Sequence, residues 1–305
     1  MAKQNRQTIS YLTRRFAEVG LEPNKRHGQN FLIDLNLIEL LARTADINSN
    51  DVVLEVGTGM GSLTTRMAER AAAIVTVEID QYLFQLAREE LERFENVTML
   101  QQDALRNKNH YADNVLDTIR KKLAAGPGRQ FKLASNLPYN IATPAVSNLL
   151  ASDITPATMT VTIQKELADR MVATPRTKDY SALSIWMQSQ CDIEIVRVMQ
   201  PSVFWPRPKV QSAIVHIVFR PEKRKRIKDV DFFHQFVRSM FFHRRKFFRS
   251  VAISAFKNEL EKPDVDAVMA QMDLGTNTRA EELSVEQMIE LGHLFQAAIE
   301  NKSKG

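Results

Sequence analysis

The feature that most constrains the fold is a strand, a glycine-rich turn, a helix and a second strand between residues 51 and 78. Asp51–Val56 is an apolar, β-branched run typical of a buried strand, and Gly57–Gly61 follows it at once. Ile74–Val77 is a second such run, and it ends in Glu78, about 20 residues after the turn. This order predicts an α/β sheet with parallel strands that binds its ligand at their carboxyl ends.

The same unit predicts a cofactor that contains a nucleoside. Glycines let the backbone approach a ligand, and a carboxylate placed like Glu78 binds ribose hydroxyls. A dinucleotide and S-adenosylmethionine both fit so far. Ser62 stands where a dinucleotide fingerprint has its third glycine, and Glu55 lies directly before the turn; both details favour a methyltransferase. We also expect Ser62 to cap the next helix. Asp103 follows a third strand and is placed to accept a hydrogen bond from an adenine amino group, or to cap a loop.

A second strand end carries an Asn-Leu-Pro-Tyr loop. Phe131–Ala134 leads into it as a strand, and Thr143–Pro144 after it is typical of a helix N-cap followed by proline at the first helical position. An exocyclic amino group on a heterocycle needs two acceptors, for which we take the Asn136 side-chain oxygen and the Pro138 carbonyl. The ring of Tyr139 could stack on the base. The same residue types also make ordinary turns.

Periodicity predicts the rest of the architecture. Seven strands are expected, over residues 51–56, 74–78, 97–100, 131–134, 158–164, 193–198 and 213–219. Residues 105–130 are expected to be a surface insertion with a helix over 113–124. From residue 231 on the patterns are helical, over 231–241, 244–257, 265–272 and 284–298. We therefore predict a doubly wound α/β domain over residues 1–228 and a small α-helical domain over residues 229–305.

Composition excludes several classes of protein. No run approaches ~18 uninterrupted apolar residues, so no membrane span is expected. The segment Met1–Arg15 is basic and lacks the apolar centre of a secretory signal. The single cysteine, Cys191, excludes an internal disulfide, fits a reducing compartment, and is expected in the core. The six histidines show no spacing suited to zinc, so no metal is expected and zinc deaminases are excluded as adenine-handling enzymes.

The charge is concentrated in one window. The chain has a formal net charge of +5, but Arg197–Arg249 holds 14 Lys and Arg against 3 Asp and Glu, a net charge of +11. The window contains two basic runs, Lys223–Arg226 and His243–Lys246, and aromatic residues follow the second run. Such a segment favours a surface for a nucleic-acid phosphate backbone over a merely solvated face.

A proline-rich loop over residues 201–210 adds two aromatic candidates. Its three prolines make the loop stiff, so its aromatic side chains are held in place. Phe204 or Trp205 could wedge beside a flipped base, or both could pack inside the protein.

In this order the residues resemble the family of small-subunit ribosomal RNA adenine-N6,N6-dimethyltransferases. Each matching piece is weak alone, but the ordered set between residues 24 and 290 is specific. The pieces are Gly28–Leu32, Glu55–Gly59, Val77–Asp80, Gln102–Ala104, Asn136–Asn140, Gln164–Glu166, Pro201–Val210 and Arg244–Lys246.

The resemblance implies a class I, Rossmann-like methyltransferase with S-adenosylmethionine as methyl donor. It implies two adjacent adenines of a small-subunit rRNA hairpin as substrate, each methylated twice, and a role in subunit assembly. We expect a cytoplasmic monomer that acts on a pre-ribosomal particle. By position, the catalytic residues fall on Asn136, Leu137, Pro138, Tyr139 and Phe204, the cofactor contacts on Asn30, Leu32, Gly57, Gly59, Glu78, Asp103, Ala104 and Asn136, and the RNA contacts on Arg244, Arg245, Lys246 and Arg249.

Three departures from the family pattern and two alternative functions stand beside this prediction. Ser135 replaces a usual glycine, the segment after Asp103 is longer than usual, and Phe247 stands where the family tends to have threonine, which bears on RNA contact. A DNA adenine methyltransferase has a similar Asp/Asn-Pro-Pro-Tyr loop, although no separate target-recognition domain is visible here. A non-catalytic RNA-binding assembly factor is the other alternative, and the intact Glu78, Asp103 and Asn136 argue against it.

Overall fold

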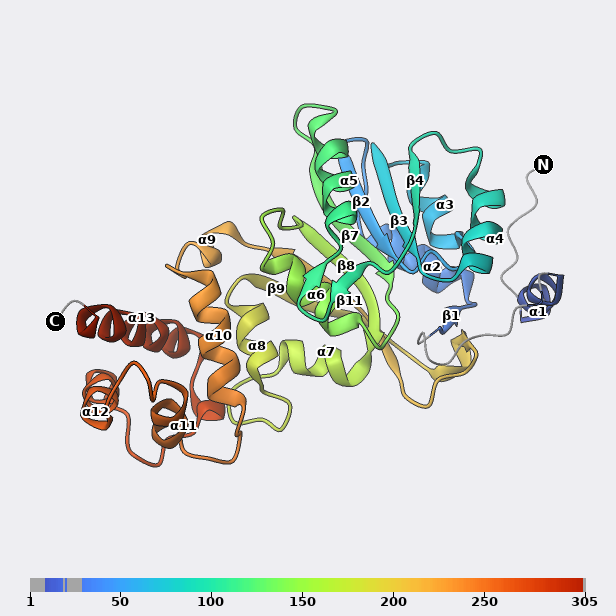
Figure 1. Ribbon diagram of the computed structural model, residues 1–305. Helices are drawn as coiled ribbons and strands as arrows, with labels where there is room; N and C mark the ends of the chain where they lie inside the picture. The colour runs from blue at the N-terminus through green and yellow to red at the C-terminus, as the bar shows by residue number, and fades with distance from the viewer. Residues whose placement is uncertain (1–8, 19, 21–28, 304–305) are drawn as a thin grey trace. The chain divides into compact units, whose positions relative to one another are not determined.

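The computed structural model describes residues 9–18, 20 and 29–303. The chain forms two compact units (Figure 1). The first holds the described residues up to Ala168 together with Glu194–Phe219, and the second holds Asp169–Ile193 together with the described residues from Arg220 on. This partition differs from the division predicted at residue 228, because helix α8 (Ala182–Gln188) packs with the later helices α10 (Val230–Phe241) and α13 (Val285–Lys302).

A seven-stranded sheet forms the centre of the first unit, as predicted. The strands in sheet order are β4 (Val97–Gln101), β3 (Ala73–Glu78), β2 (Asp51–Val56), β7 (Gln130–Asn136), β8 (Thr158–Gln164), β11 (Ser212–Phe219) and β9 (Cys191–Met199). All neighbouring pairs from β4 to β8 are parallel, while β11 runs antiparallel to β8. The chain order reverses between β2 and β7, which is where open α/β sheets bind ligands.

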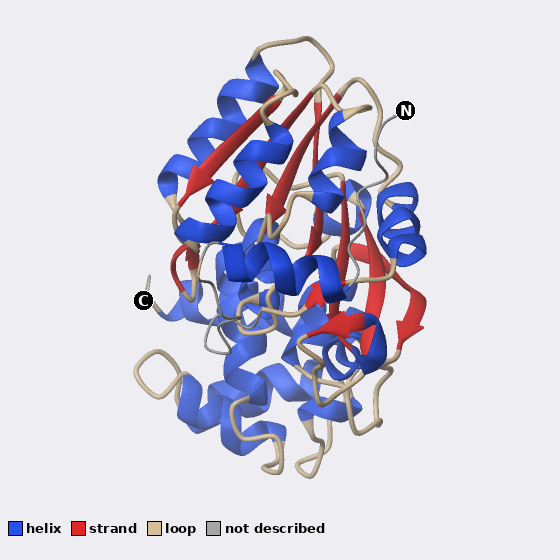
Figure 2. Cartoon of the chain, turned by 90° about the vertical axis from the view of Figure 1, so that its right-hand side faces the viewer, coloured by secondary structure: helices blue, strands red, loops and turns tan. Residues whose placement is uncertain are grey.

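The central strands are buried on both sides. Every residue of β2 and β3 is buried, which explains why these strands read as continuous apolar runs rather than alternating ones. Helices lie on both faces of the sheet (Figures 1 and 2). They are α2 (Leu35–Thr44), α3 (Ser62–Ala68), α4 (Gln81–Leu91), α5 (Asp113–Ala124) and α6 (Ala142–Leu150). Helix α7 (Lys165–Val172) follows the strand Thr158–Gln164 and passes into the second unit.

The segment 105–130 is mostly not the surface insertion that we predicted. Its helix α5 packs on β2, β3 and β7, and Val115 and Ile119 are fully buried. Two parallel strands need such a crossover helix, so α5 belongs to the basic fold. The inserted part of this segment is a short hairpin of β5 (Leu105–Asn107) and β6 (His110–Tyr111).

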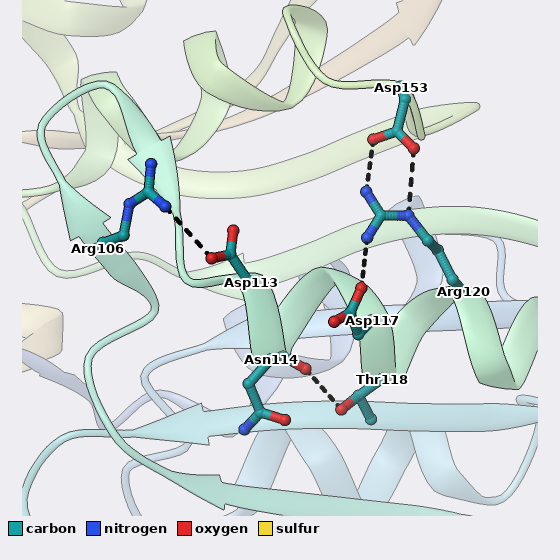
Figure 3. A network of polar contacts seen from close by, with 7 residues as sticks. All are labelled: Arg106, Asp113, Asn114, Asp117, Thr118, Arg120 and Asp153. Atoms are coloured by element: carbon teal, nitrogen blue, oxygen red, sulfur yellow. Dashed lines mark hydrogen bonds and ion pairs between the residues drawn. The ribbon is translucent and has the colours of Figure 1, made fainter.

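The exposed side of α5 carries a polar network (Figure 3). The Arg120 guanidinium donates to both carboxylate oxygens of Asp153, at 3.1 and 2.7 Å, and to Asp117 at 2.7 Å. Arg106 of the hairpin reaches Asp113 at the start of the helix, at 3.2 Å. Exposed ion pairs of this kind each stabilise a protein by only about 0–1 kcal/mol, so the buried side chains of α5 contribute more.

Two helices begin differently from the prediction. Helix α6 begins at Ala142 with Ile141 as its N-cap, because the Ile141 N–H donates to the Pro138 carbonyl at 3.1 Å. Pro144 is tolerated in the first turn, where the backbone donors have no partner within the helix. Helix α3 begins at Ser62 itself, with Gly61 as an N-cap that forms no side-chain bond.

The amino-terminal helix α1 (Ile9–Glu18) packs within the first unit through aromatic rings. Phe16 is buried and meets Phe31 edge-on, with 5.3 Å between ring centroids. It also meets Trp205 at 5.5 Å. Phe31 and Trp205 are paired residues of the short strands β1 (Phe31–Leu32) and β10 (Phe204–Trp205), and the latter follows the 3-10 turn Pro201–Val203.

The second unit is helical around a core of phenylalanine rings. Phe236, Phe248, Phe256 and Phe295 contact one another with centroids 5.1–6.4 Å apart. The helix predicted over 244–257 is shorter, since α11 begins only at Phe248, whose N–H donates to the Thr278 carbonyl at 2.8 Å. The remaining elements are α9 (Pro221–Arg224), α11 (Phe248–Ala255), α12 (Lys262–Gln271) and the 3-10 turn Ala280–Glu282. Among the described helices, none has the length and apolar character needed to cross a membrane.

Candidate active site

The glycine turn after β2 forms one wall of a cavity at the carboxyl ends of the strands. Gly57 and Gly59 have φ values of 87° and 56°, in the left-handed region that favours glycine. A Cβ atom on Gly57 would lie 3.2 Å from the Pro138 ring. Glycine therefore lets the two strand-end loops meet, because any side chain at this position would separate them.

Glu78 lies beside this turn at the end of β3. Its side chain is buried, and its two carboxylate oxygens accept hydrogen bonds from the backbone N–H groups of Gly59, at 2.9 Å, and Asp80, at 3.0 Å. Burial raises the pKa of the Glu78 carboxyl to about 7, and these two N–H groups oppose the rise. Further hydrogen-bond donors from a ligand would favour the ionised form and complete the site.

Glu55 is not part of the cavity lining, and it supports the glycine turn through buried hydrogen bonds. The Thr64 and Thr76 hydroxyls donate to its Oε2 atom at 2.5 and 2.9 Å, and the Thr58 hydroxyl lies 2.6 Å from that of Thr76. Burial raises the pKa of the Glu55 carboxyl to about 8, against these hydroxyl donors. Because Thr58 belongs to the turn, the network fixes the turn to β2, β3 and α3.

Asn136, the last residue of β7, has a defined amide orientation. Its Nδ2 atom donates to the Asn30 carbonyl at 3.0 Å, across 106 residues of sequence. Its Oδ1 atom is buried and has no partner among the described residues. Asn136 and Asn30 both line the cavity. The arrangement leaves one unsatisfied acceptor at the place where a ligand would bind.

The backbone of the loop after Asn136 is held by the sheet and by its own turn. The Leu137 N–H donates to the Thr162 carbonyl of β8 at 3.2 Å. The Pro138 carbonyl already accepts from Ile141, so it is a weaker candidate than we predicted for binding a substrate amine. The Leu137 carbonyl accepts no hydrogen bond within the described part of the chain, and Leu137 and Pro138 both line the cavity.

Tyr139 is half-buried, and its hydroxyl is engaged. The phenolic oxygen lies 2.5 Å from the Ser212 hydroxyl at the start of β11. Burial raises the pKa of the Tyr139 hydroxyl, and this bond opposes the rise. Ser212 is fully buried, so the bond fixes the Tyr139 ring to the sheet. No local sequence pattern indicates this bond, because the two residues are 73 positions apart.

The cavity contains every cofactor residue predicted from the sequence. Its wall combines four strand-end segments with the segment around β1. Gly28 of the first motif lies outside the described residues. The cavity is also lined by Gln29, Gln102 and Ile79, each from a motif noted in the sequence, and by Ser62, which we expected to cap a helix. The predicted cofactor residues that line it are Asn30, Leu32, Gly57, Gly59, Glu78, Asp103, Ala104 and Asn136.

Phe204 lies apart from the cavity lining. Its side chain is 2% exposed and packs in the core, and its backbone pairs with Leu32. In this position it presents no ring face to a base. It acts on the cavity only indirectly, because it supports the strand that carries Leu32.

The four predicted RNA-binding residues of the second unit divide into two pairs. Arg244 donates to Glu281 at 2.6 Å, and Arg249 donates to both oxygens of Asp266, at 2.5 and 2.8 Å. Arg245 and Lys246 are exposed, and neither side chain forms an ion pair within the described residues. Part of the basic window is thus neutralised by acidic residues from outside it, while Arg245 and Lys246 are available for a ligand.

Other parts of the basic window are neutralised in the same way. Arg220 and Lys223 both bind Asp192, at 2.6 and 2.7 Å, and Arg226 reaches Glu286 at 3.5 Å. Within residues 9–18, 20 and 29–303, no three metal-ligating side chains come together. Cys191 is buried, and burial raises the pKa of its thiol to about 12, as expected of an inert core residue.

Comparisons with known proteins show the family of this chain. The family model described as "Ribosomal RNA adenine dimethylase" matches residues 20–297. The chain is 36% identical over 269 residues to the ribosomal RNA small subunit methyltransferase A of Halothermothrix orenii, covering 88% of this chain and 86% of that protein. It is 35% identical over 280 residues to the protein of the same name from Clostridioides difficile, covering 92% and 93%.

Two solved structures are similar over most of the chain. A dimethyladenosine transferase from Plasmodium falciparum has a TM-score of 0.71 and 22% identity, covering 87% of this chain and 97% of that one, and it shows the fold. The 23S rRNA methyltransferase ErmE has a TM-score of 0.60 and 25% identity, covering 87% and 99%. The sheet is therefore that of the class I methyltransferases, and the chain belongs to the ribosomal RNA adenine dimethylase family.

Proposed function

We propose that this protein transfers methyl groups to N6 of adenine in small-subunit rRNA, two to each of two adjacent adenines in a hairpin. Family membership supports the reaction class. The observation that carries the proposal is the fixed Asn136 amide, whose Nδ2 is bound to the Asn30 carbonyl and whose buried Oδ1 is unpaired. A buried acceptor without a donor costs about 1–3 kcal/mol, so a ligand N–H at this point would remove that cost.

S-adenosylmethionine is the methyl donor that these residues fit. Its ribose hydroxyls would donate to the Glu78 carboxylate, and its adenine amino group would donate to Asp103, which also lines the cavity. Gly57 leaves room for a close approach to the backbone. S-adenosylmethionine supplies a methyl group already activated on a sulfonium, so the protein has mainly to position the acceptor nitrogen.

Two acceptors in the loop prepare that nitrogen. Adenine N6 is a poor nucleophile because its lone pair is conjugated with the ring. We assign the Asn136 Oδ1 atom and the Leu137 carbonyl to the two N6 hydrogens, in place of the Pro138 carbonyl, which is already bonded. Acceptors at a tetrahedral angle around N6 favour a pyramidal nitrogen whose lone pair is free, so they bind the transition state better than the planar substrate.

The same contacts give the reaction an end point. In each transfer a bond forms between N6 and the methyl carbon as the carbon–sulfur bond breaks, and N6 then releases one proton to water. After one transfer N6 therefore keeps one hydrogen, so one of the two acceptors still holds it. After the second transfer no N–H is left, and neither the Asn136 Oδ1 atom nor the Leu137 carbonyl can bind the product nitrogen. The dimethylated adenine should therefore bind more weakly than the substrate, and the reaction stops at two methyl groups.

Tyr139 is the residue that we propose to stack on the target base. Its ring is half-buried and held through the Ser212 hydroxyl. One base–aromatic stack is worth about 1–3 kcal/mol. Phe204 would have to leave the core before it could take part, so in the observed arrangement its contribution is structural.

The setting of the reaction follows from its substrate. We propose that the protein acts as a monomer in the cytoplasm on a pre-ribosomal small-subunit particle, so that methylation accompanies subunit assembly.

A methylation assay tests the proposal. The purified protein, labelled S-adenosylmethionine and small subunits that lack the modification are incubated, and the rRNA is digested to nucleosides. N6,N6-dimethyladenosine should form, and Asn136→Ala should form little. Duplex DNA of mixed sequence serves as the comparison substrate. Methylated DNA without methylated rRNA would favour the DNA enzyme, and tight subunit binding without any methylation would favour the assembly factor; either result contradicts the proposal.

A further inference from the structure

The turn between α10 and α11 presents an aromatic ring to solvent in a basic setting. Helix α10 ends at Phe241 and α11 begins at Phe248, so the run His243–Lys246 lies in the turn. Phe242, at the start of the turn, is 79% exposed and is the most exposed of the large apolar side chains in the described ranges. A single exposed apolar side chain is common and needs no explanation by itself, so its surroundings decide.

The turn is held in place by Arg244. Its guanidinium donates to the Glu281 carboxylate at 2.6 Å, to the Thr177 carbonyl at 2.9 Å and to the Lys178 carbonyl. The Lys246 N–H also donates to the His243 carbonyl at 2.9 Å. These contacts belong to the second unit alone. Because Arg244 points into the fold, the neighbouring side chains are displayed on a fixed backbone.

Two cations follow the exposed ring in the same turn, three and four residues along the chain. Arg245 and Lys246 are both exposed, and neither side chain has an ionic partner in the part of the chain that the structure describes. The His243 ring meets Phe242 nearly at right angles, with centroids 4.9 Å apart. A flat apolar ring beside two unpaired cations is complementary to one strand of nucleic acid, which combines flat bases with negative phosphates.

We propose that Phe242 stacks on an unpaired base of the RNA substrate while Arg245 and Lys246 contact phosphates of the same strand. The proposal rests on the proposed function, since it assumes that RNA is the ligand of the second unit. An apolar pocket of a protein partner would accommodate the ring of Phe242 but would leave both cations unused. RNA uses all three side chains.

Salt dependence separates the two kinds of contact. A phosphate contact releases counterions when it forms. The loss of one such contact to single-stranded RNA therefore makes the negative slope of log affinity against log salt less steep by about 0.7. A base stack releases none. Phe242→Ala should therefore lower affinity about 5- to 150-fold without changing the slope. Arg245→Ala and Lys246→Ala should each lower the slope.

The full-length protein is titrated with a 12-nucleotide uridine RNA and with an abasic strand of the same length, at several salt concentrations. Uridine offers no adenine N6 to the methylation site. Phe242→Ala should bind the uridine strand more weakly than the parent does and bind the abasic strand equally well. Phe242→Trp should restore binding, and its indole fluorescence should be quenched by the uridine strand only. Tyr82→Ala, which removes an exposed aromatic ring of the first unit, should bind like the parent.

Three results would overturn the inference. Equal binding of the uridine strand by Phe242→Ala and the parent excludes a stack. An equal loss on the abasic strand, or a changed slope, would mean that the ring only positions the cations. Weaker binding to whole subunits with unchanged binding to naked RNA would mean that Phe242 contacts a protein. The methylation assay is separate, so a parent that binds RNA through Phe242 but methylates nothing would refute the proposed function alone.

Discussion

The cofactor cavity of the first unit and the basic turn of the second unit hold their polar side chains in opposite ways. In the cavity, Glu78 and Asn136 are bound by backbone groups, and the free atom is a single buried acceptor. In the turn, one cation, Arg244, is used to hold the backbone, and its neighbours Arg245 and Lys246 are left in solvent.

The difference teaches how each region can bind. A buried, fixed acceptor selects one hydrogen-bond geometry and suits a chemical step, because it needs no rearrangement in the transition state. Exposed cations act through charge, tolerate many positions of a flexible ligand and weaken with salt. We therefore expect changes in the cavity to alter rate and cofactor affinity, and changes in the turn to alter the salt dependence of RNA binding.

The largest effect is expected from Asn136→Ala. Loss of one transition-state acceptor should slow methyl transfer by ~10²-fold or more. Single-turnover methylation with saturating cofactor and rRNA measures the step. The matched control is Asn148→Ala, which removes an asparagine amide on α6 that is bonded to the Lys108 carbonyl outside the cavity. A parent-like rate for Asn136→Ala would refute our account of the loop.

Glu78→Ala should weaken the binding of S-adenosylmethionine by at least ~1.5 kcal/mol, the loss expected for charge-assisted hydrogen bonds. Because ribose hydroxyls favour the ionised carboxylate, whose pKa is raised to about 7 in the free protein, parent affinity should rise as pH rises and level off above about 7. Calorimetric titration at several pH values measures both. With Glu78→Gln this rise should disappear; if it persists unchanged, another group is responsible.

The bond between Tyr139 and Ser212 should have a smaller effect. Tyr139→Ala should weaken adenine engagement by about 1–3 kcal/mol. The sequence alone predicts that Tyr139→Phe loses much less, but the hydroxyl holds the ring. We now expect Tyr139→Phe and Ser212→Ala each to cost about 1 kcal/mol, and the double variant to cost no more than either. The Michaelis constant for rRNA should change and the rate at saturation should not. Additive losses would show that the bond does not position the ring.

The smallest expected effect separates Arg244 from Arg245. Arg245→Ala should lower the slope of log RNA affinity against log salt by about 0.7 and leave the melting temperature unchanged. Arg244→Ala should lower the melting temperature, because it frees Glu281 and two backbone carbonyls. Thermal melts and salt titrations of the two variants provide the comparison. The reverse pattern would mean that the roles of the two arginines are exchanged.

Much of the cavity can be predicted from sequence, because its residues follow strands. Gly57 and Glu78 come directly after apolar runs and Asp103 lies two residues after β4, and parallel strands bring their carboxyl ends to one edge of the sheet. The seven strands are predictable because each is a local run of strand-forming residues. The role of α5 was not predicted, since length alone does not distinguish a crossover helix from an insertion, and only Val115 and Ile119 packed on the sheet decide it.

Sequence by itself determined the strands, the glycine turn, the acidic residue after β3 and the window of positive charge, because these depend on neighbours along the chain. Tertiary structure alone decided which groups are free. It pairs Arg244 with Glu281, buries Phe204 and turns the Asn136 amide toward the Asn30 carbonyl 106 residues away. A hydrogen bond is a matter of about 3 Å in space, and no local pattern encodes which distant residue will provide the partner.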